Sequence, residues 1–229
     1  MNNKCVDVAI IDYQMSNLHS VEAACKFVGL RPVVTSDPSE ILGAKAAILP
    51  GVGAFGEAMS RIKELGLSKA IKDFIDSGRP FVGICLGLQL LFPRSEEFGS
   101  HCGLGIVSGR IERFSSVSDV SQKVLVPQIG WNTITQVNQG WGGTLLREVK
   151  NHEFMYFVHS YFVIPDRQDC TISETEYLGT RYCSALKIDN ISAFQFHPER
   201  SGESGLEVYR NLRNEIEAVS EYIQALGSE

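Results

Sequence analysis

The chain has 229 residues, of which 44% are hydrophobic, 21% charged and 9% aromatic, a globular composition with enough apolar residues for a sizeable core. Its net charge of −6 argues against a general nucleic-acid or anionic-membrane binder. No stretch approaches the roughly 20 apolar residues of a membrane span, and the start lacks the layout of a signal peptide. We therefore expect a cytoplasmic protein that binds neither nucleic acid nor membrane.

The first half of the chain alternates short apolar runs with helical patterns. Helical spacing predicts a helix over 18–28 and helical structure over 55–77 that is broken near Gly66. Strands that alternate with helices predict a mostly parallel sheet with helices on both faces. The apolar runs that predict these strands occupy residues 6–12, 32–35, 46–49 and 80–84.

The second half changes to short alternating runs divided by turn signals, a pattern typical of mixed or antiparallel strands. Apolar residues at helical spacing then predict a closing helix over 201–225. No linker, internal repeat or low-complexity tract interrupts the pattern, so we expect residues 1–229 to form a single α/β domain. The short runs cover 106–114, 124–129, 132–137, 154–164, 171–177 and 185–188.

The cysteine pattern gives no support for a zinc or thioredoxin-type site, because none of the six cysteines forms a C-x-x-C pair. We expect neither a metal nor a cofactor. Most of the thiols should be small buried apolar side chains. The exception is Cys85, which lies between a predicted buried strand and a predicted helix. The six positions are 5, 25, 85, 102, 170 and 183.

Residues 83–87, Gly-Ile-Cys-Leu-Gly, have the form of a nucleophile elbow with cysteine in place of serine. The glycines allow a sharp turn that brings the side chain to the carboxyl edge of the sheet, where open α/β sheets bind ligands. The N-terminus of the following helix favours a thiolate over a thiol. A tight turn around a buried cysteine is the alternative, and the motif alone does not decide between them.

A cysteine nucleophile needs a general base and a group that orients the base. Of the five histidines, only His197 ends an apolar strand with a carboxylate, Glu199, two residues later. Residues i and i+2 of an extended segment face the same way, so Glu199 can bond one imidazole nitrogen while the other faces Cys85. The pattern predicts a Cys–His–Glu triad, in which proton transfer contributes about 10²–10⁴ in rate.

A glycine-rich turn, residues 49–55 (Leu-Pro-Gly-Val-Gly-Ala-Phe), follows the third predicted strand. Such turns present backbone N–H groups to an anion. Beside the other motifs, we expect Gly53 and the N–H of Leu86 to act as oxyanion donors. A phosphate site is the weaker interpretation, because neither a G-K-[ST] ending nor G-x-G-x-x-G is present.

Five ordered blocks resemble the class I, triad-type glutamine amidotransferases, and more narrowly the glutaminase subunits of imidazole glycerol phosphate synthases of histidine biosynthesis. The likeness runs from Val8 to about Leu212. It implies a flavodoxin-like fold, with a mostly parallel central sheet flanked by helices and an antiparallel extension. The blocks are 50–55, 83–92 with 94–97, 130–132 (Gly-Trp-Asn), 156–161 and 195–201.

The resemblance implies that the chain is a glutaminase. Cys85 would attack the side-chain amide carbon of glutamine, and His197 would move the proton to the leaving ammonia. Water would then hydrolyse the thioester to glutamate, while the backbone of residues 159–161 holds the substrate's amino-acid end. The implied pocket residues are Gly53, Leu86, Gln89, His159, Ser160 and Tyr161.

The resemblance also implies a partner. The chain would form a heterodimer with a (β/α)₈ cyclase, which takes up the ammonia and makes imidazole glycerol phosphate and aminoimidazole carboxamide ribotide. It implies further that the isolated chain is nearly silent until the partner's substrate sets the loop around 51–53. The residues implied at the cyclase face are Asn17, Trp131, Tyr156 and Arg200.

Three departures from the family pattern stand out. Gln14 and Ser16 occupy positions where the family usually has glycine, which implies strain if those positions need a positive φ. Gln128 stands where a Pro-His-x-Gly-Trp-Asn run is usual. The resemblance implies that this segment and the segment with Gln14 and Ser16 both lie on the side that meets the partner. Pro93 shortens the helix after the elbow.

Three alternatives stay open on the sequence alone. A paralogous glutaminase subunit would supply ammonia to a sugar amidotransferase in surface polysaccharide synthesis. A stand-alone cysteine hydrolase or peptidase would use the same elbow, but it gives no reason for Gln89 or the tryptophan block. A non-catalytic binding subunit would retain the fold alone, and the intact Cys85, His197 and Glu199 argue against it.

Overall fold

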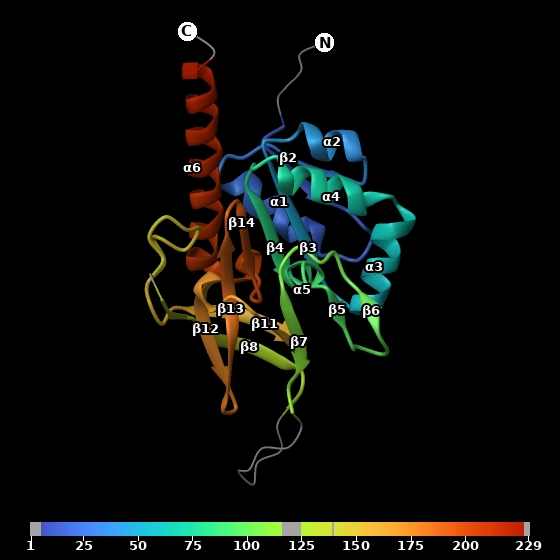
Figure 1. Ribbon diagram of the computed structural model, residues 1–229. Helices are drawn as coiled ribbons and strands as arrows, with labels where there is room; N and C mark the ends of the chain where they lie inside the picture. Colours follow the sequence, from blue (N-terminus) through green and yellow to red (C-terminus); the bar gives the residue numbers. More distant parts are fainter. Residues whose placement is uncertain (1–5, 116–124, 139, 227–229) are drawn as a thin grey trace.

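The computed structural model describes residues 6–115, 125–138 and 140–226, with 220–226 given by backbone alone. Within this part, most strands belong to one ten-stranded sheet, whose main order is β2-β1-β3-β4-β14-β13-β11-β7 (Figure 1). The first five strands of that order run parallel, and the others pair antiparallel. This topology confirms the predicted mostly parallel sheet with an antiparallel extension.

The parallel half is built from buried apolar runs. The predictions over 6–12, 32–35, 46–49 and 80–84 are confirmed as the first four strands. All but β2 are buried along their whole length, as strands covered by helices on both faces must be. The five strands are β1 (Val8–Ile11), β2 (Pro32–Thr35), β3 (Ala46–Gly51), β4 (Phe81–Cys85) and β14 (Ile191–Phe194).

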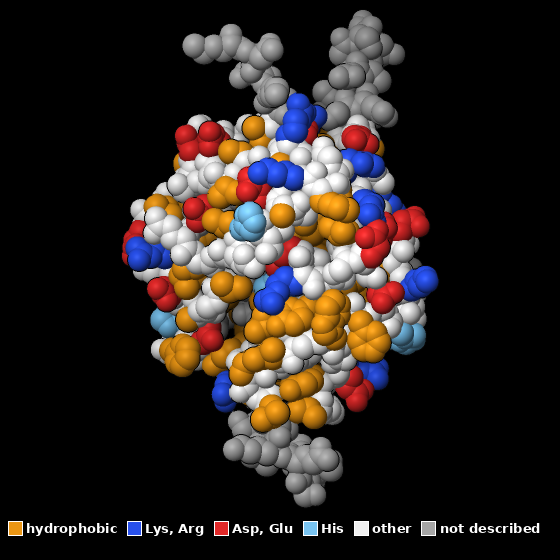
Figure 2. Space-filling model, turned by 180° about the vertical axis from the view of Figure 1, so that it is seen from behind, with side chains coloured by type: hydrophobic (Ala, Val, Ile, Leu, Met, Phe, Trp, Pro, Cys, Tyr) orange, Lys and Arg blue, Asp and Glu red, His pale blue; other side chains and the backbone are white. Residues whose placement is uncertain are grey.

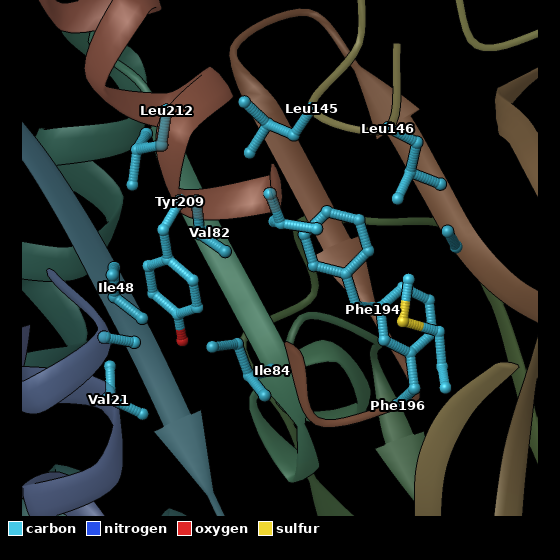
Figure 3. Close-up of a cluster of buried hydrophobic side chains, with 14 of the residues drawn as sticks. Val21, Ile48, Val82, Ile84, Leu145, Leu146, Phe194, Phe196, Tyr209 and Leu212 are labelled. Carbon is cyan, nitrogen blue, oxygen red and sulfur yellow. The ribbon is translucent and has the colours of Figure 1, made fainter. Parts of the chain in front are cut away.

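Helices cover both faces of this half. Ile10 of β1 packs in the same buried cluster as side chains of α1 and α6, whereas the next residue, Ile11, packs with those of α2, α3, α4 and α5. Figure 3 shows part of the first cluster, where Tyr209 of α6 lies beside Ile48 and Val82 of the sheet. The helices are α1 (Leu18–Phe27), α2 (Pro38–Gly43), α3 (Phe55–Glu64), α4 (Leu67–Asp76), α5 (Leu86–Leu90) and α6 (Gly202–Leu226).

The predicted helices are confirmed, and the break at Gly66 has a clear cause. Gly66 adopts φ +68° between α3 and α4, a conformation that glycine tolerates without strain. α2 has no predicted range of its own. Asp37 caps its N-terminus through a carboxylate that accepts the Ser39 N–H at 2.7 Å, and Pro38 occupies the first turn, where proline is favoured. No helix among the described residues is long and apolar enough to cross a membrane.

The antiparallel half holds the remaining strands. A separate two-stranded sheet joins β8 (Gln128–Thr133) to β10 (Phe154–His159), and a short hairpin joins β5 (Arg94–Ser95) to β6 (His101–Cys102). The main sheet takes β7 (Gly109–Arg113), β9 (Thr135–Gln136), β11 (Tyr161–Pro165), β12 (Thr171–Tyr177) and β13 (Thr180–Ile188), and two 3₁₀ turns are η1 (Gln168–Cys170) and η2 (Pro198–Arg200).

Three predicted boundaries in this half are wrong. The run 185–188 is only the end of β13, which begins at Thr180, and the other two lie at Gly130 and Ser160. The sequence pattern separates the runs 124–129 and 132–137 at Gly130, but β8 continues through that glycine, which has φ +130° and pairs with Phe157. The run 154–164 is two strands in different sheets, divided at Ser160. In both places pairing with distant segments, which local alternation does not reveal, sets the strand ends. Residue 124 lies outside the described residues.

The strain expected at Gln14 is present. Gln14 adopts φ +70°, and its N–H donates to Asp12 Oδ1 at 2.7 Å. Gln14→Gly keeps this hydrogen bond and removes a left-handed non-glycine residue, so we expect it to raise the free energy of unfolding by about 0.5–1 kcal/mol. Urea unfolding measures the change. The matched control, Gln136→Gly in the exposed strand β9, should lower the same quantity; a loss of stability in Gln14→Gly would contradict the prediction.

Candidate active site

Cys85 occupies the sharp turn between β4 and α5. It adopts φ +55°, a conformation that costs energy for a residue with a Cβ atom. The flanking glycines are required by close packing: a Cβ on Gly87 would lie 1.8 Å from the carbonyl oxygen of Leu49, and one on Gly83 would lie 3.1 Å from that of Gly87. The segment 83–87 therefore has the geometry of a nucleophile elbow, with its side chain at the carboxyl edge of the sheet.

His197 follows β14, the strand that pairs with β4 in parallel. Its Nδ1–H donates to Glu199 Oε1 at 2.7 Å, and the two side chains are 4% and 2% exposed. Burial lowers the pKa of His197, but Cys85 and the Glu199 carboxylate outweigh it and raise the pKa to about 10. The structure thus brings the three predicted triad residues together, with an imidazole that holds its proton at neutral pH.

Gln195 is a site residue that the sequence pattern did not single out. Its side-chain Nε2 donates to Cys85 Sγ at 3.7 Å, and its Oε1 accepts from Gln89 Nε2 at 3.1 Å. Gln89 Nε2 also donates to the carbonyl oxygen of Tyr161 at 2.9 Å. The signal was available, because Gln195 precedes His197 by two residues in an extended segment and so faces the same way.

A pocket with a volume of about 410 Å³ opens at Cys85. Glu97, which belongs to one of the resembling blocks but had no predicted role, contributes a carboxylate to its wall, and Glu97 Oε2 accepts the N–H of Phe55 at 2.7 Å. Arg200, implied at the partner face, lies at the same pocket. All six residues implied for the glutamine pocket line it: Gly53, Leu86, Gln89, His159, Ser160 and Tyr161.

The glycine-rich loop 50–53 is held by the preceding loop 12–17. The N–H of Val52 donates to the carbonyl oxygen of Met15 at 3.1 Å, and Ser16 Oγ donates to that of Pro50 at 3.0 Å. Gly53 has φ +99°. Leu86 opens α5, so its N–H belongs to the first helical turn, where donors lack an intrahelical partner. The loop and the helix start therefore border the pocket from two sides.

The residues implied at the cyclase face lie at the surface. Trp131 is 56% exposed, Tyr156 packs against it edge-on with ring centroids 6.0 Å apart, and the guanidinium of Arg200 lies 4.4 Å above the Tyr156 ring. Asn17, also exposed, donates to Ser20 Oγ at 3.1 Å. Figure 2 shows hydrophobic side chains gathered over β8 and β10 on this face. Further exposed apolar residues of the two strands are Ile129 and Phe154.

Of the other described cysteines, three are buried, as Cys85 is, and one is exposed. Cys25, Cys170 and Cys183 are buried, as predicted, and burial raises the pKa of Cys25 and Cys183 to about 12. Cys102 is exposed on the β5–β6 hairpin and falls outside the buried majority that was predicted. Cys5 lies outside the described residues. No group of His, Cys, Asp and Glu in the described part of the chain is arranged to hold a metal ion.

Comparison with known proteins identifies the family. A model of the class-I glutamine amidotransferases matches residues 9–215. The chain is 43% identical over 205 residues to the imidazole glycerol phosphate synthase subunit HisH of Chlorobium luteolum, covering 90% of this chain and 98% of that protein. It is 41% identical over 212 residues to the subunit of the same name from Aquifex aeolicus, covering 92% and 98%.

Solved structures match the fold at low sequence identity. A putative GMP synthase subunit from Thermoplasma acidophilum has a TM-score of 0.69 at 16% identity, covering 96% of this chain and 98% of that chain. PurLQS from Thermotoga maritima has a TM-score of 0.67 at 17% identity, covering 91% and 98%. These structures confirm the expected architecture, an α/β sheet with an antiparallel extension.

Proposed function

The chain belongs to the class I glutamine amidotransferases, and on this premise we propose that it hydrolyses L-glutamine to L-glutamate and ammonia. The observation that carries the proposal is the His197–Glu199 pair beside Cys85, which itself lies at an elbow on the wall of a pocket. Nucleophilic acyl transfer requires a cysteine, a histidine that can give and take a proton, and a carboxylate that orients the histidine.

The reaction proceeds in two stages. The Cys85 thiolate attacks the amide carbon of glutamine, and the imidazolium of His197 gives its proton to the departing ammonia, leaving a γ-glutamyl thioester. His197 then removes a proton from water as the water attacks the thioester, which releases glutamate and restores the thiolate. The N–H groups of Leu86 and Gly53 are our proposed donors to the oxyanion. Gln195 Nε2 stabilises the thiolate by its hydrogen bond to Sγ.

Glu97 is our proposed partner for the α-ammonium group of glutamine. Its carboxylate lines the pocket and is held by the N–H of Phe55. Glu97→Gln retains that acceptor but removes the charge, so we expect KM for glutamine to rise about 10- to 100-fold with a smaller change in kcat. Steady-state glutamate release measures both constants. The matched control, Glu57→Gln on α3, should leave KM unchanged; an unchanged KM in Glu97→Gln would remove this residue from the binding site.

We further propose that the ammonia passes to a cyclase subunit of imidazole glycerol phosphate synthase, in a heterodimer of histidine biosynthesis in the cytoplasm. The names of the curated relatives support this client over a sugar amidotransferase of polysaccharide synthesis. The exposed apolar side chains on β8 and β10, next to the pocket residue Arg200, form a surface suited to such a partner. Residues 1–229 act in this proposal as a single glutaminase domain.

The proposal is tested by mixing the purified chain with the histidine-pathway cyclase of its own organism and measuring glutamate release, with and without the cyclase substrate. We expect strong stimulation that depends on that substrate. If there is no stimulation but Cys85 is still alkylated by an electrophilic glutamine analogue, the chain remains a glutaminase and its ammonia goes to a different enzyme. Fast hydrolysis by the isolated chain at saturating glutamine would contradict the expectation that the free subunit has almost no glutaminase activity.

Trp131 should contribute strongly to partner binding. It is a large, half-exposed aromatic residue that contacts Tyr156 on the proposed interface. Removing a central aromatic anchor typically costs about 2 kcal/mol, so Trp131→Ala should raise the Kd for the cyclase roughly 30-fold. Titration calorimetry gives the value. Phe98→Ala is the control, because Phe98 is 87% exposed but lies on the β5–β6 hairpin; equal effects of the two variants would argue against β8 as the interface.

A further inference from the structure

A buried chain of hydrogen bonds runs beside the pocket, from Gln128 on β8 to the backbone of Tyr161. Tyr182 Oη lies 2.9 Å from the side-chain amide of Gln128 and 3.2 Å from His159 Nε2. His159 Nδ1 lies 2.9 Å from the carbonyl oxygen of Tyr161. The exposed fractions of Gln128, Tyr182 and His159 are 2%, 3% and 6%, so water does not compete for these contacts.

The chemistry of the groups determines which one donates in each of these hydrogen bonds. A carbonyl oxygen only accepts, so His159 Nδ1 carries the hydrogen that bonds Tyr161. Burial lowers the pKa of His159 to about 4, which keeps the ring neutral at pH 7 and leaves Nε2 as an acceptor. The hydrogen on that side must therefore come from the hydroxyl of Tyr182, which stays protonated because burial raises its pKa.

This direction determines what Gln128 does. Tyr182 has one hydroxyl hydrogen, and once that hydrogen bonds His159 it cannot also bond Gln128. The amide nitrogen of Gln128 is buried and has no hydrogen-bond partner among the described residues. Gln128 Oε1 faces Tyr182 Oη at 2.9 Å as the amide is drawn, and the nitrogen and oxygen of a side-chain amide can exchange places. The exchanged orientation places Nε2 toward Tyr182 Oη, so that Gln128 donates to the hydroxyl oxygen, and it leaves Oε1 at the position without a partner.

The chain ends at a structural break in the pocket wall. Strand β10 ends at His159 and strand β11 begins at Tyr161, and the His159 side chain bridges the break by its bond to the Tyr161 carbonyl. The same carbonyl accepts from Gln89 Nε2 at 2.9 Å. Tyr161 and Gln89 both line the pocket beside Cys85. The position of this wall therefore depends on His159, and the position of His159 depends on Tyr182 and Gln128.

We propose that Tyr182 and Gln128 are positioning residues for glutamine binding, acting through His159 on the carbonyl of Tyr161. The inference rests on the proposed glutaminase function and extends it to two residues outside the pocket. Gln128 departs from the pattern of the resembling family, and this role gives the departure a purpose: a non-titrating donor to Tyr182. Because Gln128 acts only through the Tyr182 hydroxyl, the effects of changing the two residues must not add.

The kinetic test uses Tyr182→Phe, Gln128→Met and the double variant, each in complex with the cyclase and its substrate. We expect KM for glutamine to rise about 10-fold in Tyr182→Phe and about 3-fold in Gln128→Met, with kcat within about 2-fold. The double variant should match Tyr182→Phe. Tyr177→Phe and Gln136→Met are the matched controls. Additive effects, or wild-type KM values in both single variants, would overturn the proposal.

A second readout does not depend on activity. Nitrogen-15 NMR of histidine-labelled full-length chain should show His159 neutral between pH 5 and 8, with its hydrogen on Nδ1. Tyr182→Phe should move the Nε2 resonance, because that nitrogen loses its donor. A hydrogen on Nε2 in the wild type would overturn the inferred chain. The hydrogen bonds could be as inferred while the wild-type complex releases no glutamate. In that case the proposed glutaminase function is wrong, and the proposed role of Tyr182 and Gln128 in glutamine binding is wrong as well.

Discussion

Cys85→Ala is expected to lower glutamate release by at least about 10⁴-fold, the largest effect of any single substitution in this chain. The variant removes the sulfur that forms the thioester and leaves the His197–Glu199 pair in place. Without a nucleophile the two-stage reaction has no first step, so the remaining partners cannot compensate. Single-turnover and steady-state assays of the cyclase complex at saturating glutamine measure the loss.

The control for this prediction is Cys102→Ser, because Cys102 is the exposed thiol on the β5–β6 hairpin. It should retain the wild-type rate. Urea unfolding should accompany both assays, since alanine at position 85 keeps the φ of +55° and should leave the free energy of unfolding within about 1 kcal/mol. Residual hydrolysis clearly above about 0.01 per cent in a folded Cys85→Ala protein would mean that another group attacks glutamine.

Glu199→Gln is expected to lower kcat by about 10²–10⁴-fold and to change its pH dependence. The carboxylate helps to raise the pKa of His197 to about 10 against the effect of burial, so a neutral amide lowers that pKa. Because His197 must be protonated to release ammonia, the alkaline limb of the kcat profile should move to lower pH. A profile measured from pH 6 to 10 on the cyclase complex tests the shift.

The His197–Glu199 pair also makes the free energy of unfolding depend on pH, in a direction that can be stated in advance. The pKa of His197 is raised on folding from the ordinary value of 6.5, so the interaction stabilises the folded protein fully below about pH 6.5 and loses this effect as the pH rises toward 10. The difference in unfolding free energy between wild type and Glu199→Gln should therefore shrink across that range. Glu203→Gln on the exposed start of α6 is the control; a difference that grew with pH would contradict the assignment.

Much of the fold could be predicted from local pattern. The parallel strands are continuous buried runs, and each long helix of the first half carries its own spacing signal, so local sequence and burial agree there. The strand ends at Gly130 and Ser160 could not be predicted in the same way. They depend on pairing of β8 with β10 and of β11 with β7 and β13, contacts between segments far apart in the chain.

The site residues also fall into those that local sequence pattern predicts and those that depend on contacts between distant segments. Cys85, His197 and Glu199 are indicated by glycine spacing and by i, i+2 geometry. Glu97 is not, because it reaches the pocket only through the hairpin β5–β6 and its bond to the N–H of Phe55 at the start of α3. The Tyr182 hydroxyl gives no signal in the sequence either, since its partners come from other strands that lie far along the chain.

The place of β14 in the sheet has a consequence for synthesis of the protein. It is the last strand in the described part of the chain, yet it pairs between β4 and β13 in the middle of the sheet. A nascent chain that ends before residue 191 therefore leaves two interior strand edges open and lacks His197 altogether. The site is completed only once the chain has been synthesised through residue 199, so a product terminated before that residue cannot consume glutamine.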